Sequence, residues 1–484
     1  MIEKKRTASF SRRKFLQNLT VSGLAVGAGG MTGAAASTRR PDGSGGKARN
    51  ILFFVSDGMN IGTLQMTAAF RSLTGGKPLA WLGLYDERPP GFTRALMDTA
   101  SANSPVTDSS AAGSAWGGGT RVNNRSLNID PRGRAHEPIL VKAKRTGRKT
   151  GLVSTARITH ATPASFAANT DSRDDEDGIA AQYLERGINL LIGGGNEHFD
   201  PARREDGRDM YAAYREAGYT VVRHRDMLAK AAAAGTPLLA VFGDSHLPYE
   251  IDRLHTPELR ARVPSLATMT TRAIRALTRS GNGFVLQVEG ARVDHGAHAN
   301  DFAATIHDQL AFDDAVRAGL EFAAGRDDTL VIVTTDHGTG GAQLNGRGPA
   351  YSTTGEHFRK VLQYRASYEA FLRGLPLEIG PELFHRSLAA HLGFELPEDL
   401  TGTLAERLTN ERTRTGSHGS GTWTLGGALR LPLLHETGVG WTSHGHTGDY
   451  VELAAHGPGA EAVTPFIRND ELHHVLTGAL GITA

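Results

Sequence analysis

The sequence predicts an α/β fold, a three-layer α/β/α sandwich in which helices cover both faces of a large, mostly parallel central sheet. Short apolar runs bounded by glycine recur along the chain, as is typical of strands buried on both faces. Segments with helical periodicity separate these runs, and the alternation predicts crossover connections between parallel strands. The runs are ILFFVSDG (51–58), GLVSTA (151–156), INLLIGGG (188–195), FVLQVEGARVDHGAH (284–298) and LVIVTTDHG (330–338).

The expected elements follow in chain order. The first strand ends at Asp57, and a helix is expected over 63–73. A polar loop and then a helix of small residues occupy 101–125, and the strand at 151–156 leads into a loop with His160, Thr162 and then Arg173. In GWTSHGHTGDYVEL (440–453) the histidines precede the strand instead of following it. Helical periodicity predicts further helices over 209–217, 265–279 and 301–324.

The regular alternation breaks between 338 and 445. Helical patterns occur there at 356–373, 380–392 and 402–411, followed by the Gly/Ser/Thr-rich stretch TGSHGSGTWTLGG (415–427). We interpret 338–445 as a helical and loop insertion that caps or borders the cleft of a single catalytic domain, 50–484.

Composition excludes several classes of protein. With 39% hydrophobic and 21% charged residues, the 484-residue chain is neither disordered nor fibrous. It has no basic stripe with interleaved aromatic residues, so nothing predicts specific nucleic-acid binding. It has no cysteine, so its stability does not depend on disulfides.

The N-terminus resembles a twin-arginine export signal. SRRKFLQ (11–17) precedes a weakly apolar, glycine-rich stretch (19–31), and Ala34-Ala35-Ala36 forms an A-x-A-like cleavage site. We therefore predict an export signal over 1–36, a linker over 37–49, and a periplasmic or secreted protein carried by the twin-arginine export machinery. The alternative is a signal anchor that stays in the membrane, although so short a glycine-rich stretch spans a bilayer poorly.

Acidic residues and histidines gather where the apolar runs stop. In open α/β sheets, functional groups collect beyond the carboxyl ends of the strands, so these side chains are expected to share one cleft. Imidazole plus carboxylate suits zinc-like metals, and oxygen-only subsets suit magnesium. The residues are Asp57, Glu289, Asp294, His298, Asp336, His337 and His446.

A serine at the start of a helix is the most specific local signal, in VTDSSAAGSAW (106–116). Backbone N–H groups at a helix N-terminus favour an anion such as phosphate. A serine hydroxyl needs a base or a metal to become a nucleophile, and no G-x-S-x-G elbow is present, which favours metal activation. The alternative is that T-D-S-S only caps the helix. Ser109 and Ser110 both fit this pattern by composition.

Six segments together resemble the alkaline phosphatase family, from about Asn50 to the C-terminus apart from the insertion. They are SDGM (56–59), VTDSSAAGSAW (106–116), STARITHATPASF (154–166) with SR (172–173), LQVEGARVDHGAH (286–298), TTDHG (334–338) and HTGDYVELAAHGPGA (446–460).

The resemblance assigns roles by position. It implies that Ser109, directly after Asp108, is the nucleophile and that Arg173 holds phosphate; the alternative for Arg173 is a surface ion pair among Asp171, Asp174 and Asp175. It implies two zinc ions and one magnesium ion, with Asp57 shared between two metals. The implied ligands are Asp294, His298 and His446 for the first zinc, Asp57, Asp336, His337 and Ser109 for the second, and Asp57, Thr162 and Glu289 for magnesium.

Three positions depart from some relatives. Some bacterial members have Asp and Lys where this chain has His160 and His295, whereas animal enzymes look similar to the pair seen here. His160 is either a ligand or an outer neighbour of the third site, where zinc or cobalt could compete with magnesium. His295 is expected to reach phosphate through water or to bond with Asp294. Thr339 replaces a supporting histidine, and His444 is a rival to His446.

The resemblance implies hydrolysis of phosphate monoesters at alkaline pH through a covalent phosphoserine, with inorganic phosphate as product. Relatives are often dimers, so a homodimer is an expectation. One alternative is a phosphodiesterase whose cleft the insertion has reshaped. Another is a non-catalytic periplasmic protein that binds phosphate or metal. A sulfatase is disfavoured because the chain has no cysteine and no C/S-x-P-x-R context at Ser109.

Overall fold

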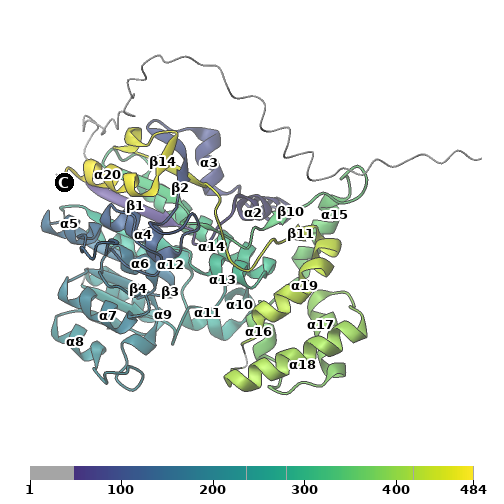
Figure 1. Cartoon of the computed structure of the whole chain (residues 1–484). Helices are drawn as coiled ribbons and strands as arrows, with labels where there is room; N and C mark the ends of the chain where they lie inside the picture. Colours follow the sequence, from purple (N-terminus) through teal and green to yellow (C-terminus); the bar gives the residue numbers. More distant parts are fainter. Residues whose placement is uncertain (1–47, 236, 280, 418, 483–484) are drawn as a thin grey trace, which may run out of the picture. The chain divides into compact units, whose positions relative to one another are not determined.

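A ten-stranded sheet forms the centre of the computed structural model, which describes residues 48–482 except 236, 280 and 418 (Figure 1). The strand order is β14-β2-β13-β8-β1-β7-β3-β4-β6-β5. β13 pairs antiparallel with both β2 and β8, and every other pairing in the sheet is parallel. The strands are β1 (Asn50–Val55), β2 (Phe92–Asp98), β3 (Lys149–Arg157), β4 (Leu190–Gly194), β5 (Thr220–Val222), β6 (Leu238–Val241), β7 (Phe284–Glu289), β8 (Thr329–Thr334), β13 (Val451–His456) and β14 (Phe466–Arg468).

The two faces of the sheet pack into different cores, as successive side chains of a strand must. Phe53 packs against Trp116 and Phe166, whereas its neighbour Phe54 packs against Phe312 on the opposite face. The first face is covered by α4 (Ser109–Gly118), α5 (Ile139–Arg145), α6 (Ala161–Ser165), α7 (Glu176–Glu185), α8 (Met210–Glu216) and α20 (Asn469–Leu480). The second is covered by α2 (Ile61–Leu73), α3 (Ala80–Glu87), α9 (Arg225–Ala234), α12 (Leu266–Leu277) and α14 (Phe302–Ala323). The predicted three-layer α/β/α sandwich is therefore confirmed.

The segment 338–445 is mostly helical, and in Figure 1 its helices lie together to one side of the sheet. Its ends meet, because two short antiparallel ribbons join β9 to β12 and β10 to β11. A third core packs its helices against α2, α10 (Glu250–His255) and α14. The elements are β9 (Gly338–Thr339), β10 (Gln343–Leu344), α15 (Thr354–Phe358), η2 (Arg359–Gln363), α16 (Tyr368–Arg373), α17 (Pro381–Leu392), α18 (Glu398–Thr415), α19 (Thr422–Thr437), β11 (Val439–Gly440) and β12 (His446–Thr447).

Two buried carboxylates fix the start of α16 to the rest of the chain. Asp252, on α10 (Glu250–His255), accepts hydrogen bonds from the backbone N–H of Ser367 at 2.8 Å and from its hydroxyl at 2.6 Å. Asp301, the N-cap of α14, accepts from the backbone N–H of Tyr368 at 2.6 Å. Burial raises the pKa of Asp301 to about 7, which shows how far this junction is removed from water.

Two sequence expectations need correction. The loop expected at His160 and Thr162 contains a short helix, α6, which His160 precedes as N-cap. The helix α19 was not predicted, because its glycines and the internal Pro432 obscure the helical pattern.

The remaining short helices are η1 (Asn196–His198), α11 (Pro257–Arg262), α13 (Arg292–His298) and η3 (Ala460–Ala462). No helix among residues 48–482, where described, is long and apolar enough to cross a bilayer. The predicted export signal, 1–36, and most of the predicted linker lie outside the described residues.

Candidate active site

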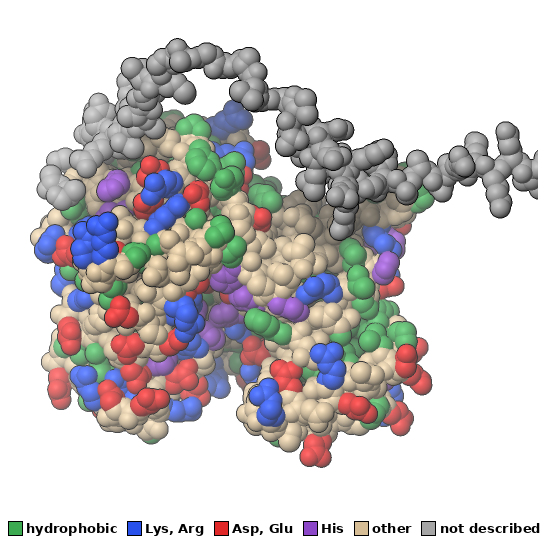
Figure 2. Space-filling model, viewed as in Figure 1, with side chains coloured by type: hydrophobic (Ala, Val, Ile, Leu, Met, Phe, Trp, Pro, Cys, Tyr) green, Lys and Arg blue, Asp and Glu red, His purple; other side chains and the backbone are tan. Residues whose placement is uncertain are grey.

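Five of the predicted residues meet at one edge of the sheet because β8, β1 and β7 are adjacent and parallel. Asp57 follows β1, Glu289 ends β7, and Asp336 and His337 follow β8. His446 precedes β13, and since β13 runs antiparallel to β8, its start lies at the edge where β8 ends. Figure 2 shows histidine side chains gathered in a hollow between the sheet layers and the helices of the insertion.

One cluster joins Asp294 and His298 of α13 to His446. The Nε2 atoms of His298 and His446 lie 3.1 Å apart, and His298 Nε2 lies 3.3 Å from Asp294 Oδ2. Each Nδ1 faces a backbone carbonyl: His446 Nδ1 lies 2.8 Å from the Thr107 oxygen, and His298 Nδ1 contacts the His444 oxygen.

This cluster fits a cation. Because a carbonyl only accepts, each Nδ1 must carry the hydrogen, and the neutral tautomer of each ring then presents a lone pair at Nε2. Two lone pairs cannot hydrogen-bond to each other, so a cation between them would satisfy both rings and Asp294. Burial is the main reason that the pKa of His446 falls to about 4, which keeps this ring neutral. His444, the rival to His446, instead directs its Nδ1 to the His298 carbonyl at 2.7 Å.

Thr339 supports this cluster from β9. Its hydroxyl donates to Asp294 Oδ1 at 2.6 Å and lies 3.3 Å from His337 Nδ1. Its backbone N–H donates to Asn60 Oδ1, which fixes its position. Thr339 therefore contacts two of the predicted metal ligands, Asp294 and His337.

A second cluster consists of Asp57, Asp336 and His337, which can each direct one ligand atom to a common point. His337 Nε2 lies 3.1 Å from Asp336 Oδ2, 3.7 Å from Asp57 Oδ1 and 3.3 Å from Ser109 Oγ. Both carboxylate oxygens of Asp57 are buried without a hydrogen-bond partner among the described residues. Buried carboxylate oxygens are rarely left unpaired, so this cluster also fits a cation.

A third cluster joins Asp57 to Glu289 and His160. Glu289 Oε2 accepts from the Ser154 hydroxyl, whereas Oε1 has no partner among the described residues. The Thr162 hydroxyl and His160 Nδ1 are likewise buried and unpartnered within that part of the chain. The structure thus brings His160 together with Asp57 and Glu289, two of the three residues predicted for magnesium.

The carboxylates of the second and third clusters repel one another electrostatically. Burial, then Asp336, Asp294 and Glu289, raise the pKa of Asp57 well above its usual value. Burial raises the pKa of Glu289 to about 7. These carboxylates are ionised at low energetic cost only when cations balance them.

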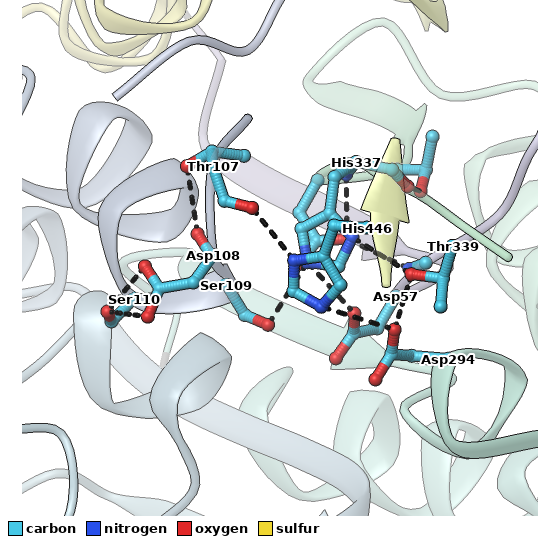
Figure 3. A network of polar contacts seen from close by, with 12 residues as sticks. Asp57, Thr107, Asp108, Ser109, Ser110, Asp294, His337, Thr339 and His446 are labelled. Atoms are coloured by element: carbon cyan, nitrogen blue, oxygen red, sulfur yellow. Dashed lines mark hydrogen bonds and ion pairs between the residues drawn. The ribbon is translucent and has the colours of Figure 1, made fainter. Parts of the chain in front are cut away.

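The two serines of T-D-S-S differ sharply in their contacts. The Ser110 hydroxyl donates to the Asp108 carboxylate, at 2.8 and 2.7 Å from its two oxygens. Ser109 lies at the first position of α4, 3% exposed, and turns its hydroxyl toward His337 (Figure 3). Only Ser109 faces the metal-fitting clusters.

Asp108 and Arg173 are paired beside Ser109. Arg173 Nη1 donates to Asp108 Oδ2 at 3.0 Å, and Nη2 lies 3.2 Å from His160 Nε2. Burial alone would raise the pKa of Asp108, but Arg173 and the Ala111 N–H hold it below its usual value. The structure therefore pairs Arg173 with Asp108 and not with the surface acids Asp171, Asp174 and Asp175.

His295 lies beside His160, with 5.8 Å between the ring centroids. Its Nδ1 lies 2.9 Å from Arg292 Nη1, and Arg292 also donates to Glu369 of α16 at 2.6 Å. Its ring packs at 4.4 Å against His246, which the sequence did not single out because His246 stands alone, without a neighbouring acidic or histidine motif. Burial lowers the pKa of both His295 and His246 well below the usual value, so both rings are neutral.

Comparison with known proteins adds independent observations. The family model described as alkaline phosphatase matches residues 48–482. Alkaline phosphatase 3 of Bacillus subtilis (strain 168) is 30% identical over 474 residues, which cover 95% of each chain. Streptomycin-6-phosphate phosphatase of Streptomyces griseus is 30% identical and matches 82% of this chain and 94% of its own. The crystal structure of Thermus thermophilus alkaline phosphatase gives a TM-score of 0.83 at 33% identity, covering 94% of this chain and 96% of that one.

Removing cations should expose the strain among the carboxylates. At about pH 8, above the pKa of about 7 that Glu289 has in the fold, we expect metal-free Asp57→Asn protein to be more stable than metal-free wild type by about 1–4 kcal/mol. The wild-type chain must bury the Asp57 charge or take up a proton, and the amide avoids both. Thermal and denaturant unfolding with chelator, and again with zinc and magnesium, measure this difference.

The same substitution should reduce the stabilisation gained from added metal, since Asp57 belongs to two clusters. Asp314→Asn, at a half-exposed carboxylate paired with Arg71, is the control. It should change neither the stability of the metal-free protein nor the stabilisation gained from added metal appreciably. Metal-free Asp57→Asn protein that is less stable than metal-free wild type would contradict the interpretation.

Proposed function

The chain belongs to the alkaline phosphatase family, and we propose that it hydrolyses phosphate monoesters at alkaline pH through a phosphoserine formed on Ser109. Hydrolysis of phosphate monoesters follows from the family. The covalent step rests on one observation: Ser109 alone of the two serines turns its hydroxyl toward the histidine and carboxylate clusters.

Different residues of this chain would bind the phosphoryl group and attack it. Arg173, held by Asp108, binds two oxygens of the phosphoryl group, since each terminal guanidinium nitrogen keeps a second N–H. Backbone N–H groups at the start of α4 add favourable charge. Ser109 Oγ, having lost its proton to solvent, then bonds to phosphorus while the ester oxygen departs from the opposite side and takes up a proton from water. Water displaces Ser109 in the second step and releases inorganic phosphate.

Three cation positions complete the proposal. The first zinc ion would be held by Asp294, His298 and His446. The second would be held by Asp57, Asp336, His337 and Ser109. Magnesium would be held by Asp57, Thr162 and Glu289. When bound, these ions supply the charge that lowers the pKa of the Ser109 hydroxyl and balances the departing oxygen. Because His160 adds a nitrogen donor to the third position, we propose that zinc or cobalt competes with magnesium there. Metal analysis after dialysis against each ion tests this competition.

Ser109→Ala should abolish turnover of p-nitrophenyl phosphate, by a factor on the order of 1000 or more, because no other side chain can form the intermediate. The assay contains zinc and magnesium, and mass spectrometry of acid-quenched wild type should find one phosphoryl group on the peptide with Ser109. Ser110→Ala is the matched control, and it should keep a substantial part of the activity. Undiminished activity in Ser109→Ala would refute the assignment, and a higher kcat/KM for bis-p-nitrophenyl phosphate would favour a diesterase.

Arg173→Ala should weaken phosphate binding more than it slows the chemical step. Loss of a charge-assisted hydrogen bond of about 1.5–3 kcal/mol predicts a rise of about ten- to hundredfold in KM and in the inhibition constant of inorganic phosphate. Arg145→Ala is the control, since Arg145 forms only an exposed ion pair with Glu137. An unchanged inhibition constant for phosphate would show that Arg173 does not hold it.

We also propose that the chain is exported by the twin-arginine route. Replacing Arg12 and Arg13 by lysine should leave most of the activity in the cytoplasmic fraction, because the export machinery reads the arginine pair. Replacing Lys4 and Lys5 by glutamine is the control. Activity and mature N-terminus are measured in periplasmic or culture fractions, and unimpaired export of the arginine variant would contradict the proposal.

A further inference from the structure

A cleft of about 330 Å³ lies beside the first cation position, between α18 and the start of α19. It is adjacent to His298, because Trp423 of α19 forms part of its wall and stacks on the His298 ring with 5.3 Å between centroids and 16° between planes. The lining residues are Arg407, Trp423, Thr424, Gly427, Ala428 and His444. None of the roles proposed above uses this cleft.

Trp423 has an unusual exposure for a large aromatic side chain. It is 53% exposed, whereas Trp81 and Trp116 are fully buried and Trp441 is 7% exposed. His444 stacks on it with 5.6 Å between centroids and only 6° between planes. Trp423 is thus held by two rings with much of its surface free, an arrangement suited to stacking against a planar ligand group.

Arg407 supplies positive charge on the α18 side of the cleft. Its side chain is exposed, and within the described part of the chain it has no hydrogen bond or ion pair. Glu411, one turn further along α18, accepts instead from the Thr424 hydroxyl at 2.7 Å. The cleft therefore combines the aromatic face of Trp423 with the guanidinium group of Arg407, which is not engaged in an ion pair with any described residue.

The position of the cleft connects it with the departing half of the substrate. A row of rings leads from the nucleophile: Ser109 Oγ lies 3.3 Å from His337, which stacks on His446 at 3.6 Å, and His446 lies 5.0 Å from His298. Trp423 continues this row beyond His298. A cation held by Asp294, His298 and His446 would balance the departing oxygen, so the substituent on that oxygen would emerge beside His298, the ring on which Trp423 stacks.

We propose that the α18–α19 cleft is a leaving-group subsite that selects phosphate monoesters whose leaving group has a planar ring and a negatively charged substituent. The ring stacks on Trp423, and the charged substituent pairs with Arg407. A volume of about 330 Å³ suits a ring system of one or two rings. This inference rests on the proposed hydrolysis of monoesters at Ser109.

Three substrates separate the contributions: glycerol 1-phosphate without a ring, phenyl phosphate with a ring, and 4-carboxyphenyl phosphate with a ring and a carboxylate. In Trp423→Ala, the ratio of kcat/KM for phenyl phosphate to that for glycerol 1-phosphate should fall about tenfold relative to wild type. In Arg407→Gln, the ratio for 4-carboxyphenyl to phenyl phosphate should fall about three- to fivefold. Leu431→Ala, on the same helix and 65% exposed, is the control and should leave both ratios unchanged.

A binding measurement avoids the chemical step. Phenylphosphonate should quench the fluorescence of Trp423, the most exposed of the four tryptophans, and methylphosphonate should not. The difference should vanish in Trp423→Phe, which keeps a ring but not the indole emission. Phenylphosphonate should also inhibit wild type more strongly than methylphosphonate, and Trp423→Ala should remove that preference.

Equal losses for all three substrates in Trp423→Ala would overturn the proposal, because they would mean that Trp423 only supports His298. Unchanged ratios would overturn it as well. Failure of the proposed hydrolysis looks different: wild type would release phosphate from none of the three substrates, or Ser109→Ala would release it undiminished.

Discussion

Mutual repulsion among buried carboxylates is the constraint on which the site depends. Asp57 lies close to Glu289, Asp294 and Asp336, which all raise its pKa, and both oxygens of Asp57 and one oxygen each of Glu289 and Asp336 have no hydrogen-bond partner among the described residues. Parallel strands force this crowding, because β8, β1 and β7 end at the same edge and each contributes an acid there. Bound cations would relieve this repulsion, and the same positive charge would prepare the site for an anionic substrate. Stability and chemistry are therefore coupled at these strand ends.

The contrast between Ser109 and Ser110 shows how neighbouring residues of one type acquire different roles. Asp108 caps α4 and accepts a hydrogen bond from the Ser110 hydroxyl, so Ser110 stabilises the turn at the start of this helix. Asp108 also holds Arg173, so one carboxylate orients both the start of the helix and the guanidinium proposed to bind phosphate. Ser109 is the residue left without such a bond, and it points to the other side of the turn.

Much of this architecture could be predicted from the sequence, for identifiable reasons. Runs such as 51–58 and 330–338 are buried on both faces, so their composition alone reveals parallel strands, and the motifs at their ends indicate the clusters. The short helix after His160 was missed because five residues give no measurable periodicity. The helix α19 was missed because its stability comes from packing in the third core, which composition does not reveal. His246 carries no local signal, since its place beside His295 depends on how distant segments pack.

The two ribbons that close the insertion, β9 with β12 and β10 with β11, bring its ends together where the chain leaves and rejoins the sheet domain. The sheet is therefore connected to these two ribbons in the same way whatever the number of residues between β10 and β11. The entropic cost of closing a longer loop grows only slowly with its length. Shortening or extending these helices would therefore leave the spacing of the strand ends unchanged. The strand ends that carry the proposed reaction centre are thus mechanically separate from the length of the helical segment, so that a change in that segment could alter the surroundings of the site without moving the strand ends themselves.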